Sequence, residues 1–253
     1  MSHHFIRFSH VSYTYPSGTK ALDNVSFLIT HGEKVALLGA NGAGKSTLLL
    51  HTNGLLLAQE GEVNVGDVPV TRKTLPLVRQ SVGLVFQNPD DQLFMPTVEE
   101  DVAFGPANMR LPDAEIGRRV EVALDRVGAL DLRRRAPSEL SGGQKRRVAI
   151  ATVLSMEPSI LVLDEPTSNL DWKAQAGLMD LLREFDHTCL IATHDLEMIR
   201  EVCRRCLVLD GGRLVADVTP EELLADGALR ALLGLGRRAP RVKSQELRVK
   251  SEE

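Results

Sequence analysis

The sequence predicts an α/β fold with a mixed, mainly parallel sheet, an N-terminal antiparallel β subdomain and an inserted α-helical subdomain. Short apolar runs bounded by polar residues recur along the chain, which is typical of parallel strands buried on both faces. Helical patterns separate some of these runs. The middle of the chain, in contrast, holds helix-like patterns and loops but no convincing strand, so it is expected to be an insertion.

The N-terminal part of the chain predicts a β-hairpin, followed by a strand, a loop and a helix. Phe5–Tyr15 has the pattern of a strand, a Ser-Gly pair makes a turn, and Leu22–Thr30 returns as a second strand. Val35–Leu38 is a short apolar strand that runs directly into a glycine-rich loop, and Lys45–Leu56 follows as a helix.

The second half of the chain alternates strands and helices. Ile160–Leu163, Leu190–Ala192 and Leu207–Leu209 are short apolar strands, and a helical stretch over Lys173–Phe185 separates the first two. Buried strands that alternate with helices in this way form a parallel sheet whose faces are covered.

Between about Gln87 and Ser155 the pattern changes to helices and loops. Asp113–Val127 predicts an amphipathic helix, which Gly128 ends. The apolar face of this helix comprises Ile116, Val120, Ala123 and Val127. The expected division is one domain over residues 1–235, with a core at about 1–86 and 156–235 and a helical subdomain at about 87–155.

The C-terminal part of the chain predicts one more helix and a tail. Thr219 and Glu222 have the spacing of a capping box at the start of a helix. Residues 236–253 carry six Lys or Arg against three Glu and few large apolar residues. We therefore expect these residues to form a disordered tail.

The composition is that of an ordinary globular protein, with 43% hydrophobic and 25% charged residues. The formal net charge of −4 argues against a dedicated nucleic-acid binder, which usually carries a basic stripe. The apolar runs are too short to cross a bilayer, and the N-terminus lacks the apolar core of a signal peptide. We therefore expect any membrane role to come through a partner.

Two of the three cysteines, Cys203 and Cys206, form a CxxC pair. A zinc site would need two more ligands nearby, and none has a suitable spacing. The pair is therefore interpreted as two semi-buried thiols before a strand, in a reducing compartment.

A phosphate-binding loop follows the strand Val35–Leu38. GANGAGKST fits the pattern G-x-x-x-x-G-K-[ST] and lies between a strand and a helix, as this motif requires. The glycines let backbone N–H groups turn toward phosphates, Lys45 brings a positive charge, and the Ser46 hydroxyl can bind Mg²⁺. The residues expected to bind nucleotide here are Gly39, Asn41, Gly42, Gly44, Lys45, Ser46 and Thr47.

Two acidic residues follow the apolar strand Ile160–Leu163. Asp164 is expected to hold Mg²⁺ through water, and Glu165 to polarise the attacking water. Many parallel strands end in acidic residues, so the pattern gains its meaning from the phosphate loop upstream.

A second anion-binding element lies in LSGGQKRR, which spans Leu140–Arg147. Ser141 and Gln144 have the spacing of a capping box, so Ser141, Gly142 and Gly143 are expected to open a helix with free N–H groups. A chain that already has one phosphate loop needs a second anion site only if this one serves a nucleotide on another subunit.

Together these motifs resemble the ATP-binding-cassette (ABC) family, which has a P-loop NTPase core, and they occur in the order of that family. The resemblance extends from about Phe5 to Leu233 and implies that Tyr15 stacks on adenine. In the family's terms the motifs are the Walker A loop (Gly39–Thr47), the Gln loop (Gln87), the signature (Ser141–Gln144), Walker B (Ile160–Asp164), the catalytic Glu165, the Asp loop ending at Asp171, and the switch His194.

The resemblance also implies a mechanism in which two subunits close head to tail over two ATP molecules. Each site would pair the phosphate-loop side of one chain with Ser141, Gly142, Gly143 and Gln144 of the other. Catalysis is assigned to Glu165, His194 and Gln87. Mg²⁺ would be held by Ser46, Gln87 and Asp164, partly through water.

A finer resemblance points to ATPases of energy-coupling-factor importers. Val82–Pro106 is similar to them, and His51–Leu56 and Leu140–Ala151 look most like their cobalt and nickel branch. This implies an ATPase pair, with a homodimer favoured, at the cytoplasmic face of the membrane. It would bind a transmembrane scaffold through Gln87–Phe104 and serve a membrane substrate-binding subunit indirectly. The expected groove offers apolar Leu93, Phe94, Met95 and Phe104 beside acidic Asp90, Asp91, Glu99, Glu100 and Asp101.

Two positions depart from the pattern, and alternative functions stay open. Asn169 stands where small residues are common, and Thr152 where this branch often has glycine. Another ABC importer or an exporter is the main alternative. A soluble ABC ATPase of iron–sulfur cluster assembly usually has Glu in place of Gln144. A nucleic-acid-linked ABC protein would need tandem cassettes or a long coiled coil, which this sequence lacks.

Overall fold

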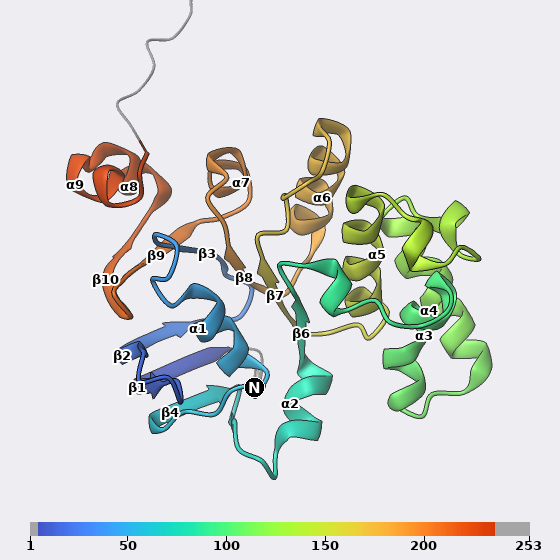
Figure 1. The fold of residues 1–253 in the computed structure, drawn as a ribbon, viewed down its shortest axis with the longest axis horizontal. Coiled ribbons are helices and arrows are strands. Elements are labelled where there is room, and N and C mark those ends of the chain that lie inside the picture. Colours follow the sequence, from blue (N-terminus) through green and yellow to red (C-terminus); the bar gives the residue numbers. More distant parts are fainter. Residues whose placement is uncertain (1–4, 236–253) are drawn as a thin grey trace, which may run out of the picture.

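The computed structural model describes residues 5–235, which form two β-sheets with helices packed against them (Figure 1). The strands are β1 (Ile6–Thr14), β2 (Lys20–Ile29), β3 (Lys34–Leu38), β4 (Glu60–Val65), β5 (Val68–Pro69), β6 (Val82–Val85), β7 (Ile160–Asp164), β8 (Thr188–Ala192), β9 (Arg205–Asp210) and β10 (Arg213–Val218). The α-helices are α1 (Lys45–Thr52), α2 (Leu75–Ser81), α3 (Val98–Asn108), α4 (Asp113–Arg126), α5 (Gly142–Leu154), α6 (Trp172–Glu184), α7 (Leu196–Glu201), α8 (Pro220–Ala225) and α9 (Gly227–Leu232).

The main sheet has six strands in the order β10-β9-β3-β8-β7-β6. All neighbours pair in parallel except β10, which is antiparallel to β9. Every residue of β7 and β8 is buried, which explains why their sequences are continuous apolar runs rather than alternating ones. The predicted mixed, mainly parallel sheet is confirmed.

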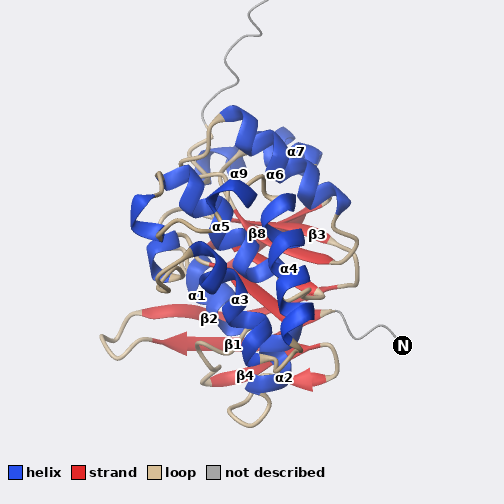
Figure 2. Cartoon of the chain, turned by 90° about the vertical axis from the view of Figure 1, so that its right-hand side faces the viewer, coloured by secondary structure: helices blue, strands red, loops and turns tan. Residues whose placement is uncertain are grey.

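A second sheet, in the order β2-β1-β4-β5, is antiparallel throughout (Figure 2). Its inner face is apolar, and the rings of Phe8 and Phe27 stack across β1 and β2 with their centroids 4.6 Å apart. Helix α1 lies between the two sheets, where Leu48 and Leu49 are buried. The antiparallel N-terminal subdomain is thus held to the core through the helix that follows the phosphate loop.

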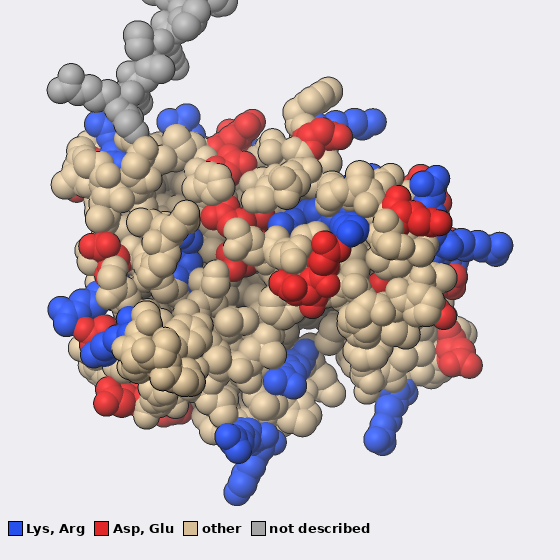
Figure 3. Space-filling model, in the orientation of Figure 1, with Lys and Arg blue, Asp and Glu red and all other residues tan. Residues whose placement is uncertain are grey.

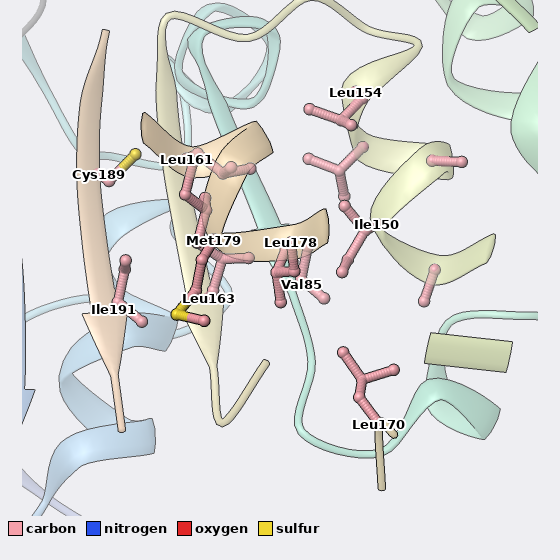
Figure 4. Packing of buried hydrophobic residues seen from close by; sticks show 14 of the residues in the cluster. Val85, Ile150, Leu154, Leu161, Leu163, Leu170, Leu178, Met179, Cys189 and Ile191 are labelled. Carbon is pink, nitrogen blue, oxygen red and sulfur yellow. The ribbon is translucent and has the colours of Figure 1, made fainter. Parts of the chain in front are cut away.

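The six-stranded sheet separates two apolar cores. Alternate residues of β3 point to opposite faces, so Val35 and Leu37 join the core around α1. Ala36 and Leu38 join the core on the other face, which α5, α6 and α7 cover. In Figure 4, Ile150 of α5 and Leu178 of α6 point into this second core. Helices α1 and α5 therefore pack on opposite faces of the sheet.

The predicted helical insertion is confirmed in its type. Between β6 and β7 the chain forms α3, α4 and α5, which pack against one another (Figure 1), with 3-10 turns at Pro89–Asp91, Leu130–Leu132 and Pro137–Glu139. Thr97 caps α3 and exchanges hydrogen bonds with Glu100 in a capping box. We keep the boundaries at about 87 and 155 as a proposal.

Several elements were not predicted from the sequence. Helix α1 ends at Thr52 rather than at Leu56, because the chain turns at Asn53-Gly54 with Gly54 in a left-handed conformation. Strand β6 is interrupted in sequence by Gly83, where a Cβ would lie 2.2 Å from the Val153 side chain. This glycine lets α5 pack closely on β6, and it weakens the apolar pattern that would have marked the strand.

The remaining predictions have mixed outcomes. The capping box of Thr219 and Glu222 is confirmed at the start of α8. Cys203 and Cys206 are fully buried rather than semi-buried, and Cys206 lies within β9 rather than before it; burial raises its pKa to about 12. The expected tail at 236–253 lies outside the described residues. Among residues 5–235, none of the helices combines the length and apolarity needed to span a bilayer.

Candidate functional site

The candidate site lies at the edge of the six-stranded sheet where the parallel strands end. Leu37 near the end of β3, Ala192 at the end of β8 and Asp164 at the end of β7 lie side by side in register. Strand β6 ends next to β7, with Val85 beside Leu163. Because the carboxyl ends of parallel strands meet at one edge, the loops that carry the predicted residues converge there.

The glycine-rich loop after β3 has a backbone that only glycine can adopt. Gly39 has φ 154° and Gly44 has φ 105°, and a Cβ on either one would lie 2.4 Å from a carbonyl oxygen of Leu209 or Ala21 respectively. At Gly42 the space around a Cβ would be open, and Asn41 is exposed beside it. The loop then runs directly into α1, so its N–H groups and the helix N-terminus share one anion-binding concavity.

Lys45 and Ser46 bring the charged and oxygen groups to this loop. The Lys45 ammonium donates hydrogen bonds to the carbonyl oxygens of Gly39 (2.7 Å) and Ala40 (3.1 Å). The Ser46 hydroxyl donates to the carboxylate of Asp164. Burial raises the pKa of Asp164, and the Ser46 hydrogen bond lowers it. A hydroxyl and a carboxylate at one point are oxygen ligands of the kind that Mg²⁺ prefers, so the donor set fits this ion.

Glu165 and His194 lie beside Asp164. Glu165 has φ 47°, an uncommon value for a residue with a side chain, and its backbone N–H donates to the Ala192 carbonyl (2.8 Å). Its carboxylate is nearly buried, and its Oε2 lies 2.8 Å from His194 Nδ1. The contact lacks hydrogen-bond geometry, so this oxygen makes no hydrogen bond. His194 is exposed, so its imidazole can also contact a bound group.

Gln87 lies just past the end of β6 and is exposed. The guanidinium of Arg146, from α5, donates to the carbonyl oxygens of Phe86 (2.6 Å) and Gln87. Arg146 is only 1% exposed, and burial lowers its pKa while Asp164 and Glu165 raise it. This arginine therefore joins the helical insertion to the Gln87 loop and to the acidic side of the site.

Sequence reasoning gave no role to Arg146. A signal was present, because Arg146, Ile150 and Val153 fall on one face of α5 at helical spacing, and that face is buried. An arginine at a core-facing position needs partners that satisfy its charge.

A second polar link between the insertion and the core was also missed. The Gln92 amide donates to the Ala149 carbonyl and to the Thr152 hydroxyl, each at 2.7 Å, and accepts from the Phe86 backbone N–H at 3.1 Å. Thr152, which departs from the family pattern, thus supplies an acceptor.

The signature segment forms the N-terminus of α5, as predicted. Ser141 and Gln144 form a capping box, in which the Gln144 side chain accepts from the Ser141 backbone N–H (2.9 Å). Asn169 lies against this tip, since a Cβ on Gly143 would be 3.1 Å from the Asn169 carbonyl. Asn169 has φ 63°, which asparagine tolerates better than most residues, and this accounts for its departure from the small residues of the family.

A cavity of about 1020 Å³ opens beside the signature tip. Its lining includes Ser141, Gly142, Gly143, Gln144, Asn169 and Asp171. The structure does not bring this tip to the phosphate loop, because α5 and α1 pack on opposite faces of the sheet.

Tyr15, the candidate for adenine stacking, lies next to the phosphate-loop helix. Its hydroxyl is 3.1 Å from the Thr47 hydroxyl oxygen, and its ring is partly exposed. The ring meets Tyr13 edge to face at 5.1 Å, and Tyr13 meets His51 in the same way at 5.0 Å. The ring is thus fixed at the border between the second sheet and the loop.

The segment Gln87–Phe104 divides into buried and exposed residues. Leu93 and Asp101 are buried, so the expectation that they face a partner is wrong. Asp101 instead accepts hydrogen bonds from the backbone N–H groups of Phe94 and Met95, both at 3.0 Å. Phe94 is 63% exposed and meets the exposed Phe104 edge to face, with 4.9 Å between centroids.

Comparisons with known proteins identify the family of the chain. Residues 22–168 match the family model described as ABC transporter. The chain is 56% identical over 237 residues to an ABC transporter ATP-binding protein of Geobacter sulfurreducens, covering 94% of this chain and 95% of that one. It is 49% identical over 236 residues to the energy-coupling factor transporter ATP-binding protein EcfA of Methanothermobacter thermautotrophicus, covering 90% and 76%.

Two solved structures share the fold. The first is CbiO1 of Clostridium perfringens, described as part of the ABC transporter complex CbiONQ, with 41% identity, a TM-score of 0.77, and coverage of 94% of this chain and 96% of that one. The second is a dimer of the ATP-binding cassette MJ0796 in a post-hydrolysis state with ADP and Pi, with 30% identity, a TM-score of 0.78, and coverage of 85% and 98%. The chain therefore belongs to the ABC transporter family, as an ATP-hydrolysing, ATP-binding subunit.

Proposed function

We propose that this ATPase works as a head-to-tail homodimer, in which each ATP lies between the phosphate loop of one copy and the signature tip of the other. The observation that carries the proposal is that the two helices whose N-termini carry the anion-binding elements, α1 and α5, pack on opposite faces of one sheet. One chain does not direct both at the same nucleotide, whereas a second copy related by a twofold axis can complete the site.

Complementation of two inactive variants tests this arrangement. Lys45→Ala removes the charge of the phosphate loop, and Gly143→Asp places a negative charge at the signature tip. Each variant alone should be inactive. A mixture should recover activity, because in a mixed dimer the intact loop of the Gly143→Asp chain meets the intact tip of the Lys45→Ala chain. ATP hydrolysis by Gly143→Asp alone, or no recovery in the mixture, would contradict the shared site.

On the phosphate side, the proposed roles follow from the positions of the groups. Lys45 neutralises the β- and γ-phosphates, and the loop N–H groups hold their oxygens. Ser46, Gln87 and Asp164 would hold Mg²⁺, with Asp164 acting through water. Bound Mg²⁺ would supply positive charge to the phosphate oxygens. On the base, the partly exposed ring of Tyr15 stacks against adenine.

The chemical step is assigned to Glu165. Its carboxylate can accept the proton of the attacking water, whose oxygen forms a bond to the γ-phosphorus. The bond between this phosphorus and the bridging oxygen breaks, and ADP leaves. His194, 2.8 Å from the same carboxylate, orients the γ-phosphate. Ser141, Gly142, Gly143 and Gln144 of the partner close the site from the other side.

We further propose that the dimer powers an importer of the energy-coupling-factor type, for cobalt or nickel ions. The similarity to EcfA and to CbiO1, which is part of a complex named CbiONQ, supports the importer type, whereas the choice of ion rests on the resemblance of His51–Leu56 and Leu140–Ala151 to the cobalt and nickel branch. The ATPase would lie at the cytoplasmic face of the membrane and attach through a transmembrane scaffold. A nucleic-acid partner would be expected to meet a basic stripe. Over the face drawn in Figure 3, basic and acidic side chains are instead interspersed.

The proposed contact with the scaffold is the exposed aromatic pair Phe94 and Phe104. Asp90 and Glu99 nearby already pair with Lys145 and Arg133 of this chain, whereas Asp91 and Glu100 are exposed and form no ion pair within residues 5–235. The partner segment is therefore expected to be apolar where it meets the two rings, with at most a few basic residues facing the two acids. An exposed apolar patch of this kind marks interaction sites.

Co-purification from native membranes tests the importer proposal. Recovery of a transmembrane scaffold together with a small membrane substrate-binding subunit would support it, and that subunit would identify the substrate class. Phe94→Ser should lose this recovery, whereas Leu77→Ser, which changes a similarly exposed apolar side chain on α2, should retain it. Recovery of an unrelated permease, or only of iron–sulfur cluster assembly proteins, would contradict the proposal.

A further inference from the structure

Trp172 is the most exposed large apolar side chain among residues 5–235, with 81% of its surface accessible. It is also the only tryptophan in the chain. It begins α6, directly after Asp171, whose side chain caps the helix by accepting from the Ala174 backbone N–H (2.8 Å). The cap fixes the direction of this first turn, so the indole projects from a rigid position. Exposed tryptophans at rigid positions are typical of interfaces.

The segment Glu165–Asp171 connects the two halves of the proposed site within one chain. At its start, Glu165 is fixed to the sheet edge by its hydrogen bond to Ala192. Near its end, Asn169 and Leu170 lie against Gly143 of the signature tip, at 3.1 and 3.8 Å from the position of its Cβ. The segment thus runs from the phosphate half-site to the signature half-site.

Symmetry then fixes where this segment lies in a head-to-tail dimer. One composite site contains the phosphate loop of a chain, and the other contains the signature tip of that same chain. A twofold axis exchanges the two sites, so it passes midway between them. A segment that joins the phosphate half-site to the signature half-site of one chain must therefore approach the axis, where it faces its own copy.

We propose that Trp172, which continues this segment, is buried against the same segment of a second copy of this chain when MgATP closes the dimer. The inference rests on the proposed head-to-tail dimer. The occupant is a second copy rather than the membrane scaffold, because Trp172 directly follows the segment Glu165–Asp171, whose Asn169 and Leu170 lie against the signature tip. The aromatic pair assigned to the scaffold belongs instead to the segment before α3 and to α3 itself.

The single tryptophan makes the test direct. The full chain carrying Glu165→Gln is mixed with MgATP, and the unchanged chain with a non-hydrolysable ATP analogue. In both, oligomeric state is measured by sedimentation, and tryptophan exposure by the emission maximum and by acrylamide quenching. We expect a dimer, a blue-shifted emission and several-fold weaker quenching than without nucleotide. In the Glu165→Gln background, Trp172→Ala should raise the dimer dissociation constant about tenfold or more, as is usual for an interface hot spot. Leu77→Ala should leave it unchanged.

Each outcome separates the inference from the dimer on which it rests. A dimer in which the indole stays as quenchable as in the nucleotide-free chain would overturn the role of Trp172 and leave the dimer standing. Protection that appears only with membranes of the native host would assign the indole to another partner and also overturn it. If sedimentation shows no dimer under either condition, both the proposed dimer and the inference fail.

Discussion

The two halves of the proposed site are built in different ways. The phosphate half-site stands on the ends of buried parallel strands, and β7 and β8 place Asp164, Glu165 and His194 with no freedom in register. The signature half-site is the tip of one helix in the insertion, joined to the phosphate side by polar links through Arg146 and Gln92. The chemistry is therefore fixed by the sheet, whereas the position of the signature depends on a few replaceable contacts.

The largest expected effect lies on the phosphate side, at Glu165. Glu165→Gln should retain ATP binding and lose about two to four decades of turnover, the usual contribution of a general base. The measurement is steady-state phosphate release together with nucleotide affinity. Lys45→Ala should instead weaken nucleotide binding. Hydrolysis at a near-normal rate in Glu165→Gln would remove this carboxylate from the role of base.

The next largest effect is expected at the joint between the halves. Arg146→Met would leave the Phe86 and Gln87 carbonyl oxygens without their charged donor, at a cost of about 2–4 kcal/mol in the free energy of unfolding. Arg147→Met is the matched control, because Arg147 is less buried and donates to the Gly128 carbonyl at the end of α4. Its cost should stay below about 1.5 kcal/mol.

Urea denaturation of the two variants gives this comparison. Arg146→Met should also reduce turnover, whereas Arg147→Met should retain it. Of the two arginines, Arg146 is the one that bonds to the loop carrying Gln87. Equal losses of stability, or a fully active Arg146→Met, would show that the insertion is positioned by its apolar core and not by this arginine.

The same contrast explains what the sequence could and could not predict. The phosphate loop, Asp164 and Glu165 follow short local patterns whose meaning depends only on an adjacent strand or helix, so the sequence was enough to place them. The joints are different, because Arg146 and Gln92 have partners about 60 residues away in the chain. Strand β6 was not predicted for a related reason. Gly83 interrupts its apolar pattern, and a glycine is needed there because the Val153 side chain of another element, α5, packs against it.

A smaller effect is expected at the base of the nucleotide. Removing an aromatic stack costs about 1–3 kcal/mol, so Tyr15→Ala should weaken ATP affinity about 5- to 150-fold. Tyr15→Phe keeps the ring and loses only the contact with Thr47, so its affinity should fall by no more than about tenfold. Equilibrium binding of ATP to both variants measures the difference. Equal losses would assign the role of Tyr15 to its hydroxyl rather than to stacking.

The smallest effect is expected in the insertion, where Asp101 holds the loop that carries Phe94. The pKa of Asp101 is raised above its usual value, mainly by burial and to a smaller extent by the nearby Glu100. The hydrogen bonds from the Phe94 and Met95 backbones lower it only in part. A carboxyl whose pKa is higher in the folded protein binds more protons when folded. Its contribution to stability is therefore complete below the unfolded pKa of about 3.9 and is lost as pH rises through the folded pKa.

Asp101→Asn removes this titration and keeps an oxygen that can accept both backbone hydrogen bonds. As pH rises from about 4 toward neutrality, the unfolding free energy of the unchanged chain should fall relative to that of Asp101→Asn, as measured by urea denaturation at several pH values. Gln92→Leu removes an uncharged link in the same insertion. The difference in unfolding free energy between this variant and the unchanged chain should not change with pH. A difference for Asp101→Asn that stayed constant would mean that the pKa of this carboxyl is the same in the folded and unfolded chain. A difference that grew in favour of the unchanged chain as pH rose would mean that the carboxylate is stabilised in its charged form. The insertion would then hold its exposed aromatic loop by an ionised group.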